Sequence, residues 1–144
     1  MKNTKSERGQ SLVEFAISLT IILWLLAGAV EFGIALFQYI QLRDAAQEGA
    51  LYGSINPDDT AGIEARVRAA SSSPIDLSDP SVDVQISYPD GACKVADGIM
   101  VRVEYPHKIF MPFATLFTGG SDTINLGADV TDTILQAPPG ATCP

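Results

Sequence analysis

The stretch from residue 8 to residue 15, RGQSLVEF, places a glutamate at the edge of a long apolar segment. The segment FAISLTIILWLLAGAV that follows, at 15–30, contains no charged side chain. As a helix it would span about 24 Å, slightly less than the ~30 Å hydrocarbon core of a bilayer. Glu14 and Glu31 would lie about 25 Å apart along the helix axis, one near each interface. The pattern predicts a membrane-spanning helix. Because ionisable residues in such helices are usually retained for a function, Glu14 is expected to have one.

The charges before the apolar segment predict its orientation. The first nine residues contain Lys2, Lys5 and Arg8 against a single acidic residue, Glu7. Positive charge is retained on the cytoplasmic side of a membrane helix, so the N-terminus should be cytoplasmic and residues beyond Leu42 should lie outside.

Three kinds of N-terminal segment fit this pattern. A plain membrane anchor would keep every residue, and a secretory signal peptide would be cut at the Ala-Gly-Ala sequence at 27–29. A prepilin-type signal would be cut on the cytoplasmic side between Gly9 and Gln10 and would keep its apolar helix. A signal peptide gains nothing from a carboxylate at the start of its apolar region, and a plain anchor merely tolerates one. Glu14 therefore favours the prepilin-type signal.

The helical pattern continues beyond the apolar segment as EFGIALFQYIQLRDAAQEGALYG, at 31–53, without a proline. One face carries mostly small side chains, at Leu42, Ala45, Ala46, Gly49, Ala50 and Gly53. The polar face of the same helix consists mainly of Gln41, Arg43, Asp44, Gln47 and Glu48. Because small residues allow another element to approach the backbone closely, the helix should leave the membrane unbroken and pack a narrow face against a globular head.

These two blocks resemble the TadE-like proteins of the tight-adherence (Tad, or Flp) pilus system, a branch of the type IVb pilins. The first block matches the family pattern of glycine, four residues, glutamate and an aromatic residue at Gly9, Glu14 and Phe15. The second resembles the family's stretch around Glu31, Phe32, Gly33, Ala45, Ala46, Glu48, Gly49, Tyr52 and Gly53. The resemblance covers about residues 8–53. One departure is Leu51, where many relatives carry a basic residue.

The resemblance implies a minor pilin or pseudopilin that supports assembly of an adhesive type IV pilus. A prepilin peptidase would cut between Gly9 and Gln10, and Glu14 and Phe15 would serve assembly. The partners would be other pilins, pilus-assembly membrane proteins, the peptidase and the lipid bilayer. The chain would be a single-pass protein of the cytoplasmic membrane with an extracytoplasmic head, or would enter a surface pilus. Two alternatives stay open: the major subunit of a pilus, and an unprocessed membrane-anchored binding or sensor module.

The whole chain is expected to have an α+β fold divided into a leader at 1–9, a long helix at 10–53 and a head at 54–144. A turn at 54–59 precedes a short helix that ends near Ala70. Alternating apolar residues predict strands at 81–88 and 99–105 and a third from about Thr123. Three strands that each have one apolar and one polar face indicate an antiparallel sheet whose apolar face packs on the helices.

Apolar side chains crowd the connection between the second and third expected strands. They are Ile109, Phe110, Met111, Phe113, Leu116 and Phe117. They would either cover the open end of a small core or form a docking patch for another pilin subunit.

Both cysteines, Cys93 and Cys143, lie in the C-terminal half. If this half is outside the cytoplasm, the two should form a disulfide; otherwise they are free thiols. A bridge would close a loop of about 50 residues, stabilise the fold by about 4 kcal/mol and fasten the C-terminal tail to the head.

The composition gives no support for several other function classes. The net charge is −8 and no cluster of Lys and Arg occurs in the head, which argues against nucleic acid as a partner. His107 is the single histidine and has no cysteine cluster beside it, so the usual zinc patterns are excluded and a surface or packing role is expected. Acidic residues at 57–59 and 76–83 lack EF-hand spacing and suit capping, with a calcium site as the alternative. We expect no enzyme activity, no cofactor and no metal.

Overall fold

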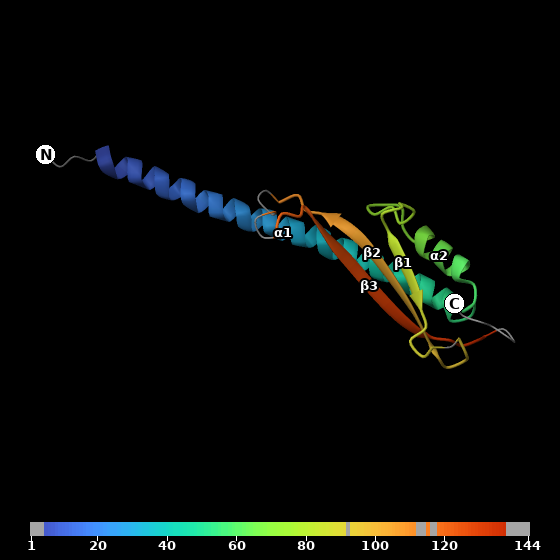
Figure 1. Cartoon of the computed structure of the whole chain (residues 1–144). Coiled ribbons are helices and arrows are strands. Elements are labelled where there is room, and N and C mark those ends of the chain that lie inside the picture. The colour runs from blue at the N-terminus through green and yellow to red at the C-terminus, as the bar shows by residue number, and fades with distance from the viewer. Residues whose placement is uncertain (1–4, 92, 112–114, 116–117, 138–144) are drawn as a thin grey trace.

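Figure 1 shows a computed structural model of the chain, which describes residues 5–91, 93–111, 115 and 118–137. A single long helix, α1 (Lys5–Gly53), extends far beyond the rest of the molecule, and its C-terminal half packs against the second helix and the last two strands. The remaining elements are α2 (Thr60–Ala69), β1 (Asp83–Ser87), β2 (Gly98–Lys108) and β3 (Thr123–Thr133). The strands form one antiparallel sheet in the order β1-β2-β3. The predicted α+β fold is confirmed.

The short helix α2 is capped by Asp59. The Asp59 side chain accepts a hydrogen bond from the backbone N–H of Gly62, at 2.9 Å, and from the hydroxyl of Tyr52, at 2.8 Å. These two bonds, the one from Gly62 first, hold the pKa of Asp59 below its ordinary value. Ile63 and Val67 then face the core, as the helical pattern predicts.

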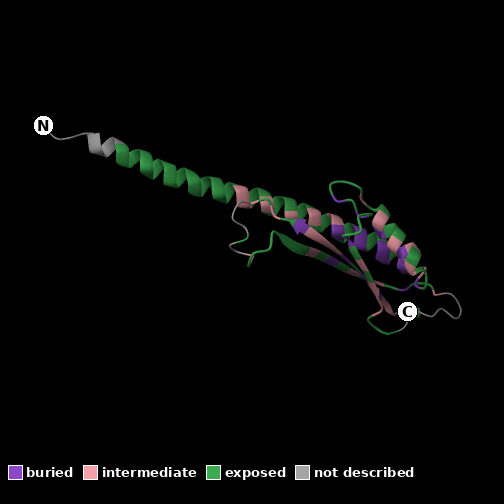
Figure 2. Cartoon of the chain, turned by 45° about the horizontal axis from the view of Figure 1, so that its top comes forward, coloured by how far each residue is buried: buried purple, intermediate pink, exposed green. Residues whose placement is uncertain are grey.

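The core lies between the sheet and the two helices. Figure 2 shows the buried residues gathered around the C-terminal half of α1, with the N-terminal half exposed. In β2 the alternation places Ile99, Val101 and Val103 inward, and each is fully buried. From the helices and the connections the core receives Leu42, Ala45, Ala46, Ala50, Ile63, Val67, Ile75 and Leu77.

Two glycines in α1 allow the close packing that the sequence indicates. A Cβ built on Gly49 would lie 2.5 Å from Cγ2 of Val67, and one built on Gly53 would lie 2.5 Å from Cδ1 of Ile99. No real side chain tolerates such contacts, so α2 and β2 could not approach α1 as they do if either position carried one. The prediction of a small-residue packing face is confirmed.

We therefore expect Gly49→Ala to lower the free energy of unfolding by about 1–3 kcal/mol, because the added methyl group overpacks the core. The matched control is Gly33→Ala, since Gly33 lies in the same helix with nothing within 4 Å of its Cβ position. The control should be neutral or stabilising by up to about 1 kcal/mol, as alanine is the better helix former. Chemical denaturation in detergent micelles would compare them, and equal effects would contradict the packing argument.

The second strand is longer than expected. The sequence pattern predicts an end at Tyr105, but β2 continues to Lys108, which pairs with Thr123 of β3. Pro106 is tolerated because β1 pairs with β2 no further than Glu104, so the last part of β2 has only β3 beside it. The β2–β3 hairpin thus extends past the core toward the projecting part of α1 (Figure 1).

Candidate functional site

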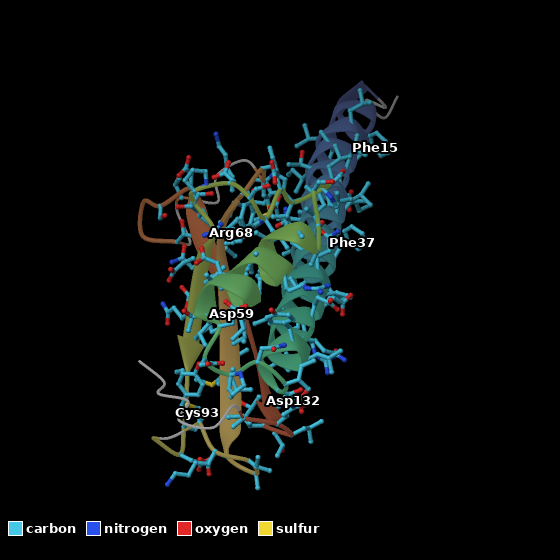
Figure 3. The ribbon with its side chains drawn as sticks, turned by 90° about the vertical axis from the view of Figure 1, so that its right-hand side faces the viewer. Phe15, Phe37, Asp59, Arg68, Cys93 and Asp132 are labelled. Carbon is cyan, nitrogen blue, oxygen red and sulfur yellow. The ribbon has the colours of Figure 1, made fainter. Side chains whose placement is uncertain are left out.

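The residues expected to serve processing and assembly lie on the projecting part of α1. Gly9, Gln10, Glu14 and Phe15 are all helical and exposed. Figure 3 shows Phe15 on this arm, well away from the sheet. These residues therefore lie on the part of α1 that projects beyond the described residues of the head.

Glu14 lies on a partly polar face of the arm. One shallow depression on the helix surface is lined by Gln10, Val13, Glu14, Ile17 and Ser18. The Glu14 carboxylate has no hydrogen-bond or ion-pair partner among the described residues. It is available for an interaction with another molecule or with a new N-terminus.

Most of the arm has an apolar surface. α1 contains a stretch long and apolar enough to cross a membrane, and none of that stretch is buried within the molecule. Its exposed apolar side chains include Phe15, Ile17, Ile21, Ile22, Leu23, Trp24, Leu25 and Leu26. The helix is therefore suited to act as a membrane anchor.

A polar cluster that the sequence analysis did not identify joins α1 to the hairpin. Nε2 of His107 lies 2.8 Å from Oε1 of Glu31, and Nδ1 of His107 lies 2.6 Å from Oε1 of Gln38. The second carboxylate oxygen of Glu31 accepts a hydrogen bond of 3.0 Å from the backbone N–H of Phe110. His107 is 1% exposed and the Glu31 side chain 15%.

The cluster forms one connected hydrogen-bonded set. Each ring nitrogen of His107 has a polar partner, Glu31 at Nε2 and Gln38 at Nδ1, and the second oxygen of Glu31 accepts from the hairpin backbone. The buried ring is therefore fully hydrogen-bonded where the helix meets the sheet.

Part of this cluster could have been predicted from the sequence. Ile99, Val101 and Val103 face inward, so the same alternation predicts that His107 does as well. Glu31 and Gln38 are seven residues apart, on the helical stripe that continues to Ala45. The sequence predicts that His107 is a surface or a packing residue. The structure shows that it is buried and hydrogen-bonded to Glu31 and Gln38.

The structure describes half of the expected docking patch. Ile109 and Met111 are partly buried, while Phe110 is 72% exposed. Ile109 and Met111 help to line an open groove of about 300 Å³. Its other lining residues are Gly28, Glu31, Phe32, Ala35, His107, Thr118 and Ile124. Phe113, Leu116 and Phe117 lie outside the described residues. The described part of the patch therefore lies against the helix, next to Glu31.

Cys93 is buried near the opposite end of the sheet from this groove (Figure 3). It is not a free thiol. Cys143 lies outside the described residues, so the pairing of the two stays a prediction.

The acidic residues at 76–83 are engaged in local turns. The Asp76 carboxylate accepts hydrogen bonds from the hydroxyl and the backbone N–H of Ser78, and these lower its pKa. Asp79 accepts from the backbone N–H of Ser81, with the same effect on its pKa. Among the residues the structure describes, no three His, Cys, Asp or Glu side chains gather closely enough to hold a metal ion.

Comparison with known proteins agrees with the resemblance seen in the sequence. The family model of TadE-like proteins matches residues 9–51. The match confirms the resemblance over this region and supports a pilin-like protein associated with the Tad pilus and its components. No curated protein and no solved structure matches the chain significantly.

Proposed function

We propose that this chain is a minor, pilin-like subunit that supports assembly of a Tad-type adhesive pilus. A prepilin peptidase cuts it between Gly9 and Gln10, α1 holds it in the cytoplasmic membrane, and the head lies outside. The observation that carries the proposal is the TadE-like match, which begins at Gly9 and spans the apolar part of α1. In this function the chain is a substrate of the peptidase and a partner of other pilins, with no catalytic role or cofactor of its own.

The surroundings of Gly9 support a role in recognition. Nothing lies within 4 Å of the position that a Cβ would take at Gly9, so the fold itself does not require glycine there. A need for glycine would arise in the peptidase, which must fit the backbone closely at the bond it cuts. The arm also leaves Gln10 exposed, so this bond is accessible.

Gly9→Val should accumulate as a full-length species that retains residues 1–9, because the added side chain crowds the peptidase at the cut. N-terminal sequencing and intact mass of the membrane-extracted protein would measure this. Gly33→Val is the matched control, since its Cβ position is equally open, and it should be cut normally.

The wild-type N-terminus separates the alternatives in the same experiment. A mature chain that starts at Gln10 supports the proposal. A start at Val30 would mean a conventional signal peptide, and an uncut chain would mean an anchored binding or sensor module.

We further propose that Cys93 pairs with Cys143 once the head is exported. Alkylation of the native, exported protein should leave both thiols unmodified until a reductant is added. Loss of the bridge by Cys143→Ser should destabilise the head by up to about 4 kcal/mol, because the unfolded chain regains the freedom of a long loop. Two thiols that react freely without reductant would refute the pairing, and mass spectrometry after digestion would show which occurs.

A further inference from the structure

We propose that the end of the head nearest the projecting arm rests in the membrane interface, with lipid acyl chains in its apolar groove. The surface concerned consists of Phe32, Ile109, Phe110, Met111 and Ile124, and is called the collar below. The proposal rests on the anchoring of α1 in the membrane as proposed above. It concerns how the head sits, which anchoring alone leaves undetermined.

The length of the anchor places the collar at the bilayer surface. A hydrocarbon core of ~30 Å requires about 20 helical residues. Counted from Phe15, where the uncharged segment begins, the core ends near Ile34. Glu31 and Phe32 then lie at its edge, and Phe110 lies at the same level because its backbone N–H contacts Glu31. The hairpin therefore meets the helix at the depth where the helix leaves the bilayer.

The polar cluster makes this depth acceptable for a glutamate. A carboxylate costs a few kcal/mol at the bilayer centre and less toward its edge, so a carboxylate at the edge is expected to have partners. Here the hairpin supplies both His107 and the Phe110 N–H to the Glu31 carboxylate. The head thus provides polar partners for the carboxylate at the depth where the helix leaves the hydrocarbon.

The apolar groove is continuous with the surface that lipid covers. One wall is formed by Gly28, inside the uncharged segment, and by Phe32 just beyond it. The opposite wall is formed by Ile109 and Met111, and Phe110 projects beside them with 72% of its surface exposed. Glu31, His107 and Thr118 complete the lining. Because Gly28 belongs to the uncharged segment, the hydrocarbon around residues 15–30 adjoins the groove directly, and acyl chains are the occupant that we propose.

Quenching of tryptophan fluorescence by brominated lipids tests the proposal, because bromine quenches only on close approach. The full chain would be reconstituted in phosphatidylcholine vesicles brominated either near the carbonyl end or near the middle of the acyl chains. Trp24 is the single native tryptophan and reports on anchoring. In a Trp24→Phe background, Phe110→Trp reports on the collar and Ile124→Trp gives a second reading. Val95→Trp is the matched control, because Val95 is exposed and lies just before the start of β2, at the other end of that strand from Lys108.

We expect the tryptophan at 110 to be quenched several-fold more than the one at 95, and most strongly by bromine near the carbonyl end. Quenching of both collar tryptophans no stronger than at position 95, with Trp24 quenched normally, would overturn this inference alone. That result would place the collar in water or beneath another subunit. An unquenched Trp24 would overturn the anchoring proposal itself and the inference with it.

Discussion

Glu14→Ala should be inserted in the membrane and cleaved like the wild type, but should lose at least about tenfold in incorporation into pili. Neither insertion nor cleavage needs the charge. Cleavage after Gly9 creates an ammonium group at Gln10, four residues or about one helical turn before Glu14. Pairing of this ammonium with the carboxylate has to contribute only about 1.4 kcal/mol for the tenfold effect, because 1.4 kcal/mol is a factor of ten in an equilibrium.

The pairing that we expect joins two subunits. Glu14 is exposed and has no partner among the described residues, so its carboxylate is open to the amine of a newly arriving subunit. Pairing within one chain is the alternative. In that case Glu14→Ala would still leave an unpaired ammonium, but contacts with neighbouring pilins would not depend directly on the carboxylate.

Cross-linking to partner pilins and pilus counts would measure the effect. Ser18→Ala is the control, since Ser18 lines the same depression without carrying a charge, and it should assemble normally. If Glu14→Ala is cleaved and cross-links as efficiently as the wild type, Glu14 is only an interfacial residue and the assembly role is wrong.

Local periodicity explains why the elements of the fold could be predicted. The stripe from Leu42 to Gly53 has the spacing of a helix face, and the alternation from Ile99 to Val103 has that of a half-buried strand. Both patterns are properties of neighbouring residues, so the sequence alone carries them. The short helix α2 could also be predicted from local sequence, because aspartate at the first position before a helix is a favourable cap and Asp59 occupies that position.

The cluster at Glu31 could not be predicted in the same way. His107 lies 76 positions from Glu31 and 69 from Gln38. Alternation indicates that His107 faces inward, but its partner depends on how far the hairpin extends along α1. That distance is set by β2 and β3, which are 11 residues each, and the sequence pattern ends β2 too early, at Tyr105.

The same extension explains the apolar connection. A shorter hairpin would have left Ile109 and Met111 over the end of the core. The longer one carries them past the core to Gly28, where they form the groove. The position of Ile109 and Met111 therefore depends on the length of β2 and β3. The types of the residues in the connection do not predict that length.

Loss of either Glu31 or His107 should have a large effect on the stability of the head. We expect Glu31→Leu and His107→Leu each to lower the free energy of unfolding by about 1–3 kcal/mol, because each leaves a polar partner at the helix–sheet junction without its hydrogen bond. The double variant Glu31→Leu/His107→Leu should lose less than the sum of the two single losses, since apolar replacement of a whole buried pair is often tolerated. Unfolding in detergent micelles would complete this double-mutant cycle.

The exposed pair of Arg102 and Glu104 on the outer side of the sheet provides the control. Its side chains are 2.7 Å apart but 49% and 25% exposed, so Arg102→Ala should cost no more than about 1 kcal/mol. If the single variants at Glu31 and His107 cost as little as Arg102→Ala, or if their effects simply add, the contact between them contributes little to stability. The head would then be held on α1 by the small-residue stripe alone. A large, non-additive loss would instead show that the contact between Glu31 and His107 fastens the hairpin to α1.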